Sequence, residues 1–207
     1  QSRSSAASDV YKRQAHLGPL LLHARIPGML TTLLFSLLAA APGGGATFDL
    51  PCHYAQKDAG GMIESAEHCA RVEGDGLVFQ PDILRVMDFN ADGLSPVFAH
   101  RSWHWVRPDG KSVPVLTYDN FADDFEAGLT RGPWSGGMAY YDTDLNRVLT
   151  TPFEWVDRYS GGLAVVCEGC RKTFTPDGEH SFMSGGEWGA IDRQGRLVLP
   201  LLSLIHI

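Results

Sequence analysis

The chain has 207 residues, with 24 acidic against 17 basic side chains and a formal net charge of −7. This acidic balance argues against nucleic acid and anionic membranes as partners, because both would repel the protein. Glycine and proline are abundant, at 23 and 12 residues, and long apolar patterns of helical period are missing from the sequence. We therefore expect an all-β fold of short strands and turns.

Both ends of the chain carry segments that we interpret as sequencing-adapter sequence and not as part of the folded protein. Most of residues 1–14 back-translates codon by codon into a transposase adapter used to prepare DNA libraries, and residues 202–207 back-translate into the reverse complement of its inner end. We therefore expect the apolar 202–207 tail to form no strand. On this interpretation the sequence is a metagenomic fragment that lacks further C-terminal units, and the unit ending at Pro200 presents an unpaired edge.

Residues 29–46 have the character of a secretory signal peptide. The apolar stretch after Met29 is shorter than the roughly 20 residues of a membrane span, and small residues precede Thr47 as a cleavage site. We expect export to the periplasm or the medium, without stable membrane insertion after cleavage. A retained N-terminal anchor is the alternative, and residues 15–28 are interpreted as untranslated upstream sequence.

Four cysteines follow the leader, an even number that indicates disulfides in an exported chain. Proximity in the sequence favours pairing Cys52 with Cys69 and Cys167 with Cys170. The second pair could instead form half of a zinc site or a redox motif. A closed zinc site needs four ligands, and the best extra candidate, His180, brings the number only to three. No helix is expected after Cys170 to lower a thiol pKa.

Residues 47–71 are expected to form an N-terminal cap pinned by the first disulfide. Within it, residues 63–68 are the only segment that could start a short helix. From Val72 onward the pattern changes, and Gly-Leu pairs recur at a spacing of about 35 residues. A fixed period of this length indicates a repeat architecture.

Each Gly-Leu pair is followed by a short strand, a polar turn and a second strand, and residues 187–200 are the best-preserved copy. We expect antiparallel hairpin or meander units over residues 72–201, since a lone hairpin cannot bury its apolar face. The predicted core positions are Trp103, Met138, Trp188, Leu94, Leu129 and Leu163.

The run from Glu187 to Pro200, with Gly162-Leu163-Ala164 upstream, resembles the WG-repeat (KWG-type) family of bacterial β-repeat proteins. The resemblance covers about residues 72–201 and is strongest in the last unit. His104 stands where the family has glycine, and Met138 stands where it has tryptophan. The resemblance implies an array of short antiparallel strands and a role in binding a protein or an envelope component, and it supplies no catalytic residues.

The third unit carries an insertion at residues 167–182, and repeat proteins often place such insertions on a binding face. Its candidate contact residues are Glu168, Arg171, Lys172 and His180. We therefore expect an exported, non-enzymatic module that binds an unknown protein or cell-envelope component and needs no cofactor.

The sequence gives only weak signals for calcium binding and for nucleophilic catalysis. Residues 88–93 match the first half of an EF-hand loop, but Ala99 stands where the bidentate glutamate should be. A Gly-x-Ser-x-Gly elbow is absent from the sequence. His104 is expected to be solvated or hydrogen-bonded on the strand face opposite Trp103 and Trp105.

The alternative function is a carbohydrate-binding or hydrolytic envelope protein. Exposed tryptophans would serve as its sugar platforms, and the candidates are Trp103, Trp105, Trp134, Trp155 and Trp188.

Overall fold

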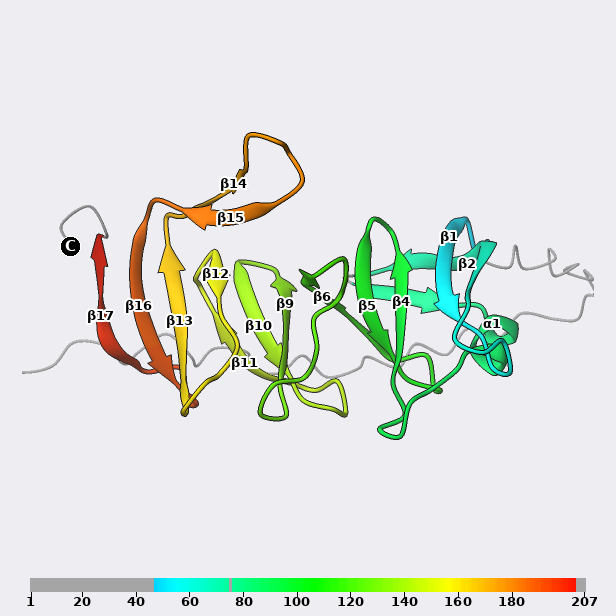
Figure 1. Ribbon diagram of the computed structural model, residues 1–207. Helices are drawn as coiled ribbons and strands as arrows, with labels where there is room; N and C mark the ends of the chain where they lie inside the picture. Colours follow the sequence, from blue (N-terminus) through cyan, green and yellow to red (C-terminus); the bar gives the residue numbers. More distant parts are fainter. Residues whose placement is uncertain (1–46, 75, 204–207) are drawn as a thin grey trace, which may run out of the picture. The chain divides into compact units, whose positions relative to one another are not determined.

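A computed structural model describes residues 47–74 and 76–203 (Figure 1). Most of these residues lie in short antiparallel β-strands, and one short helix interrupts them. The all-β prediction is therefore confirmed. The predicted segments 1–14, 15–28 and 29–46 lie outside the described residues, as do residues 204–207 of the tail.

The first sheet has six strands in the order β3-β2-β1-β4-β5-β6. Their bounds are β1 Leu50–Ala55, β2 Ile63–Glu73, β3 Gly76–Phe79, β4 Ser95–Ala99, β5 Ser102–Val106 and β6 Ser112–Val115. Strand β1 pairs directly with β4. The N-terminal segment therefore shares a backbone hydrogen-bond ladder with the strands that follow it.

The predicted helix start at residues 63–68 is wrong. This segment opens β2, where Ile63 pairs with Ala55 and Ser65 pairs with His53. Pairing with β1 outweighs a weak helical preference in so short a segment. The helix lies instead at α1, Pro81–Val86, where Pro81 occupies the first turn and needs no hydrogen-bond partner for its nitrogen.

The two predicted disulfides are present. Cys52 on β1 is joined to Cys69 on β2, with their Cα atoms 5.7 Å apart, and both side chains are fully buried. Cys167 is joined to Cys170, with Cα atoms 6.0 Å apart.

The remaining strands form two larger sheets and two isolated hairpins. The second sheet has the order β11-β10-β9, and the third has the order β12-β13-β16-β17. The bounds are β9 Thr130–Trp134, β10 Gly137–Tyr141, β11 Arg147–Thr151, β12 Trp155–Val156, β13 Leu163–Glu168, β16 Glu187–Asp192 and β17 Leu197–Ser203. The hairpins are β7 Thr117–Tyr118 with β8 Phe121–Ala122, and β14 Arg171–Phe174 with β15 Ser181–Ser184.

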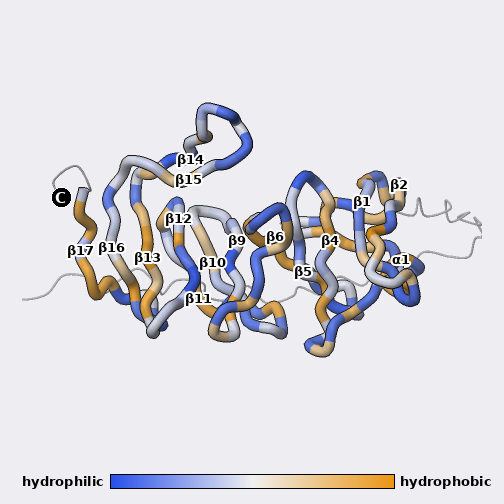
Figure 2. Tube along the Cα trace, viewed as in Figure 1, coloured by the Kyte–Doolittle hydropathy of each residue, from blue (hydrophilic) through white to orange (hydrophobic). Residues whose placement is uncertain are grey.

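Strand β17 extends further than the sequence predicted. Leu202 pairs with Trp188 and Ser203 pairs with Glu187, so these two residues are strand and the expectation for them is wrong. The ladder with β16 sets their conformation whatever their origin. Within the described residues β17 is the edge strand of its sheet. Figure 2 shows it as an apolar strand, and Leu199 and Leu202 are each 56 % exposed.

One turn geometry recurs in three antiparallel trios, β4-β5-β6, β9-β10-β11 and β13-β16-β17. In the turns at 107–111, 142–146 and 192–196 the first amide donates to the fifth carbonyl, over 2.8 to 3.0 Å, and the fourth amide donates to the first carbonyl over 2.9 Å. The fourth residue has positive φ in all three turns, and it is Gly110, Leu145 or Gly195. Leu145 therefore adopts a conformation that its two equivalents satisfy with glycine.

Strand β10 is buried on both faces. Ala139 and Tyr141 pack with Trp105 and Val113 of the first sheet. On the other face, Met138 and Tyr140 join Ala164 and other side chains of the third sheet in a separate core. The middle trio is therefore packed between the other two.

The predicted core positions do not share one environment. Leu94 and Met138 are buried, whereas Trp103, Leu129 and Trp188 are half-buried. Leu163 is 40 % exposed and does not take a core position. It pairs with Asp192, on the face of β13 opposite the buried Ala164, so the alternation of strand residues turns it outward.

Gly132 on β9 provides a test of how closely the first two trios approach. A Cβ atom there would lie 1.9 Å from the carbonyl oxygen of Pro114 on β6. We expect Gly132→Ala to lower the free energy of unfolding by about 2 to 4 kcal/mol, because the backbone of β6 must move. Chemical denaturation measures this loss.

Gly76→Ala is the matched control, since a Cβ at Gly76 meets no atom within 4 Å. Its stability should stay within about 0.5 kcal/mol of the parent. Equal stabilities of the two variants would contradict the close approach of β9 to β6.

Candidate functional site

The expected insertion at residues 167–182 contains a two-stranded hairpin, β14–β15. It leaves the sheet where β13 ends and returns where β16 begins, and Figure 1 shows it projecting beyond that pair of strands. Its strands pair with each other and, among the described residues, with no other strand. The hairpin therefore adds surface to the sheet without extending it.

The base of the hairpin is fixed by close contacts. The disulfide between Cys167 and Cys170 brackets Gly169, whose amide donates to Glu154 Oε2 over 2.8 Å. Across the base, a Cβ at Gly186 would lie 2.4 Å from the carbonyl oxygen of Glu168. Gly186 also has a φ of 68°, a conformation that favours glycine. The direction in which the hairpin leaves the sheet is therefore constrained.

The tip of the hairpin is ordered by its own polar groups. The amide of Thr175 donates to the His180 carbonyl over 2.9 Å, and the amide of His180 donates to the Thr175 hydroxyl over 3.1 Å. The Thr175 hydroxyl and the Glu179 amide donate to Asp177, and these bonds lower the pKa of its carboxyl group. The turn thus holds its shape without a contribution from the core.

Two exposed phenylalanines distinguish the hairpin. Phe174 is 61 % exposed and Phe182 is 53 % exposed. The strand register places them on opposite faces, because Phe182 pairs with Thr173 while Phe174 pairs with Ser181. Neither phenylalanine is among the contact residues expected from the sequence, although the alternation in residues 171–174 and 181–184 indicates strands.

The four predicted contact residues are all exposed. Glu168 is the last residue of β13, at the base, where it pairs with Glu187. Arg171 and Lys172 lie on β14, and the Lys172 ammonium lies 5.4 Å from the ring centre of Phe174. His180 lies at the tip. The structure therefore spreads the four along the hairpin and adds the two aromatic side chains between them.

A buried ion network lies elsewhere, between the second trio and its neighbours. The carboxylate of Asp123, with no exposed area, accepts from Arg131 Nε over 3.1 Å and from Arg158 Nη2 over 2.8 Å. Arg131 Nη1 also donates to the Val156 carbonyl over 2.7 Å and to Asp157 Oδ1 over 2.9 Å. The side chain of Arg131 is only 4 % exposed.

The backbone around Asp123 is satisfied as well. Its carbonyl accepts from Trp105 Nε1 over 2.9 Å and from the Thr130 hydroxyl over 2.8 Å. Burial lowers the pKa of Arg158, but its hydrogen bond to Asp123 and the charge of that carboxylate outweigh burial, so the pKa is raised overall. A cluster satisfied from within in this way is structural, and we assign it no catalytic role.

His104 is buried on the face of β5 opposite Trp105. It is 4 % exposed, and its Nδ1 hydrogen-bonds the Ser102 carbonyl over 3.2 Å. Burial lowers the pKa of His104 from 6.5 to about 4. Of the two expected environments, solvated or hydrogen-bonded, the structure shows the hydrogen-bonded one.

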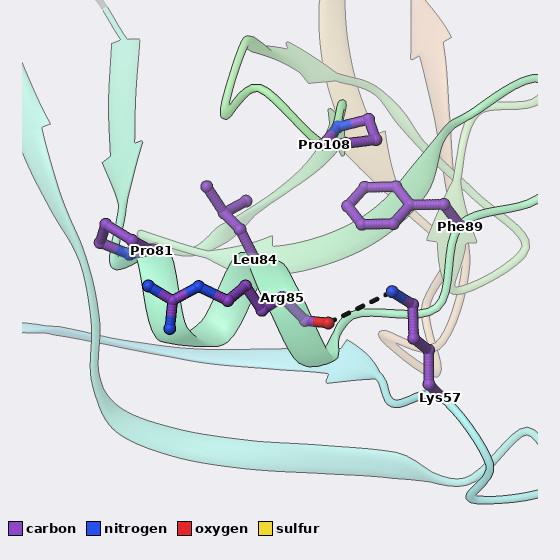
Figure 3. A pocket seen from close by; sticks show the side chains of 6 residues that line it. All are labelled: Lys57, Pro81, Leu84, Arg85, Phe89 and Pro108. Atoms are coloured by element: carbon purple, nitrogen blue, oxygen red, sulfur yellow. Dashed lines mark hydrogen bonds between the residues drawn. The ribbon is translucent and has the colours of Figure 1, made fainter.

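A hollow of about 450 Å³ beside helix α1 is lined by apolar side chains and two cations (Figure 3). One of those cations already has a partner, because Lys57 Nζ donates to the Arg85 carbonyl at the end of α1 over 3.2 Å. The other, Arg85, forms an ion pair with Asp82 on the same helix. The hollow therefore follows from the packing of α1, and its charges stabilise the helix.

The described residues contain no group of three or more His, Cys, Asp or Glu side chains placed to hold a metal ion. In the calcium-like segment, Asn90 Oδ1 accepts from the amides of Asp92 and Leu94 and so closes its own turn. Of the helices described, none is long and apolar enough to cross a membrane. Comparison of the chain with protein-family models, curated proteins and solved structures gave no match.

The ion network gives a stability prediction. We expect Asp123→Asn to lower the free energy of unfolding by about 3 to 5 kcal/mol, because two arginines lose their shared buried carboxylate. Urea denaturation measures the change. The control is Asp82→Asn, which removes the exposed ion pair to Arg85 and should cost less than about 1 kcal/mol. Similar losses of unfolding free energy in Asp123→Asn and Asp82→Asn would contradict the argument that the Asp123 ion pairs matter because they are buried.

His104 gives a pH prediction. Its pKa is lower in the folded than in the unfolded chain, so its contribution to stability is complete above about pH 6.5 and is lost as the pH falls toward 4. We expect the parent to lose about 3 kcal/mol more than His104→Gln between pH 7 and pH 4. Urea denaturation of both proteins at several pH values tests this. Parallel stability curves would show that His104 is not buried in its neutral form.

Proposed function

We propose that the chain is an exported, non-enzymatic binding module of WG-repeat type, which contacts a protein or envelope partner through the β14–β15 hairpin. The observation that carries the proposal is the hairpin itself, an insertion with two exposed phenylalanines and a fixed base. The pairing of β13 with β16 is complete without the hairpin, since Glu168 pairs with Glu187 at the base of the hairpin.

The repeat character of the proposal is supported by the three trios. Each is an antiparallel meander whose last two strands are joined by the same turn, with matching hydrogen bonds and a positive φ at the fourth residue. Neighbouring turns also interact, because Arg107 and Lys111 of the first turn donate to the Thr143 and Asp144 carbonyls of the second. Residues 103, 138 and 188 each lie four residues before the first residue of the turn in their trio.

The N-terminal residues are proposed to act as a cap. Tyr54, Phe79 and Met87 join Val97 and Val106 in one core. Strands β1 to β3 and helix α1 thereby cover the face of the first trio that the second trio leaves free. A terminal unit of a repeat array needs such a cover to remain soluble.

Export is proposed from the leader-like residues 29–46, and the two disulfides support it, because such bonds persist in oxidising compartments. The exposed phenylalanines match the aromatic enrichment of protein interfaces. Arg171 and Lys172 beside them provide charge for orientation and for the rate of encounter.

A double variant tests the proposal, Phe174→Ser with Phe182→Ser. Because both side chains are exposed, we expect stability within about 0.5 kcal/mol of the parent per site. A photo-crosslinker at Ser181 of the parent is expected to capture a protein from a bacterial envelope extract, identified by mass spectrometry. We expect the double variant to lose this capture.

The matched control carries Val72→Ser and Val148→Ser, two exposed valines on other strands, and should capture the same protein as the parent. Unchanged capture by the phenylalanine variant would refute the assignment of binding to the hairpin.

A further inference from the structure

One face of the first sheet is covered over only part of its width. Trp105 and Val113, on β5 and β6, pack against the second trio. The same face continues across β4 and β1, where Phe98 is half-buried and His53 is exposed. On this face of the first sheet, the part over β5 and β6 is therefore covered by the second trio, and the part over β4 and β1 is open to solvent.

A row of rings set by the strand register runs from the open part of this face to its boundary with the covered part, where Trp103 packs against the core shared with the second trio. His53 pairs with Phe98, and Phe98 pairs with Trp103, so the three side chains lie on one face of neighbouring strands. The ring centres are 6.3 Å apart for His53 and Phe98 and 5.4 Å apart for Phe98 and Trp103. Phe121 of the β7–β8 hairpin continues the row, 4.6 Å from Trp103.

A hollow of about 500 Å³ opens beside this row. Its lining includes Leu50, Pro51, His53, Phe98, His100 and Arg101. None of the residues that line it carries a carboxylate, although the chain as a whole has a net charge of −7. The hollow is therefore mainly apolar, and its polar lining side chains, His53, His100 and Arg101, carry no negative charge. It lies on a protein that is acidic as a whole.

The turn formed by His100 and Arg101, which line the hollow, has an unusual backbone conformation. Ala99 pairs with Ser102, so His100 and Arg101 are the central residues of a two-residue hairpin turn, with φ of 47° and 66°. Such turns prefer Asn-Gly, because a side chain in the left-handed region costs about 1 kcal/mol. The neighbouring turn at Asp119-Asn120 does carry residues that suit this conformation. Strain of this kind is enriched at functional sites.

We infer that this surface, made of the ring row from His53 to Phe121 and the His100–Arg101 turn, is a second binding site, for acidic oligosaccharides. The apolar faces of sugar rings stack on aromatic side chains. The Arg101 guanidinium has the fork geometry that pairs with a sugar carboxylate. The lack of acidic lining gives charge complementarity to a uronic acid.

The row has the length of a short oligosaccharide, although its ring planes are tilted by 36° to 68° from one neighbour to the next. Neighbouring strands lie about 4.8 Å apart, so the face from β2 across β1 and β4 to β5 spans about 14 Å. Ser65 on β2 is hydrogen-bonded to His53 Nδ1 over 2.7 Å, which orients the imidazole at that end. A proline-rich peptide is the competing ligand for an aromatic surface, but a neutral peptide would leave the cationic turn without a role.

The site differs from the tryptophan platform expected from the sequence. Trp105 is buried, and Trp103 is the one tryptophan of the row. The other ring positions and the turn belong to residues that the sequence analysis did not select. The inference is independent of the hairpin proposal, because the two surfaces share no residue.

Titration of the full chain with tri-galacturonic acid, followed by calorimetry, tests the inference. We expect saturable binding by the parent and at least tenfold weaker binding by Arg101→Gly. The variant's thermal midpoint should equal or exceed that of the parent, because glycine relieves the strained turn. Weakened binding could then not be attributed to unfolding. Arg171→Gln on the hairpin is the matched control, and it should bind like the parent.

Four outcomes would overturn the inference. They are absence of saturable binding by the parent, equal binding by Arg101→Gly, equal affinity for the neutral trisaccharide cellotriose, and saturable binding of a proline-rich decapeptide in place of the acidic sugar. Loss of binding in Phe121→Ser, an exposed site at the far end of the row, would support the full extent of the surface. Unchanged binding in that variant would contradict the part assigned to Phe121.

Discussion

The carboxylate of Asp123 is the point on which the arrangement of the trios depends. It lies in the segment between β8 and β9, yet it binds Arg131 on β9 and Arg158 beyond β12. Through Arg131 the same network reaches the carbonyl of Val156 on β12. Ion pairs as buried as this one add little net stability, because desolvation offsets their attraction. Their contribution here is to favour one alignment, since any other leaves a charge unpaired.

Apolar packing provides the stability that the network does not. Three cores succeed one another along the chain, and β10 contributes to two of them with alternate residues. The period of two in a strand allows one short segment to serve both neighbours. Because both faces of β10 are covered, this strand offers no free face to a partner.

The sequence was informative where a rule of local chemistry applied. Glycine-containing turns, the alternation in residues 187–200 and the proximity of the cysteines predicted the β class and both disulfides. Residues 63–68 were mispredicted because pairing with β1 lies outside the local pattern, and Leu163 was mispredicted because the face of β13 is set by its register with β16. The ion network and the row of rings could not be predicted, since they depend on the pairing of β1 with β4 and on packing between the trios, which local sequence patterns do not encode.

The self-contained hydrogen bonding of the β14–β15 hairpin has a consequence for protein engineering. Its tip is held by Thr175 and His180, and its base by Gly186 and the Cys167–Cys170 bond, so the cores receive little from the segment between. Residues 171–184 can accordingly be exchanged as a cassette. A foreign hairpin of different length, grafted between Cys170 and Gly185, would be displayed on the same scaffold without repacking the sheets below.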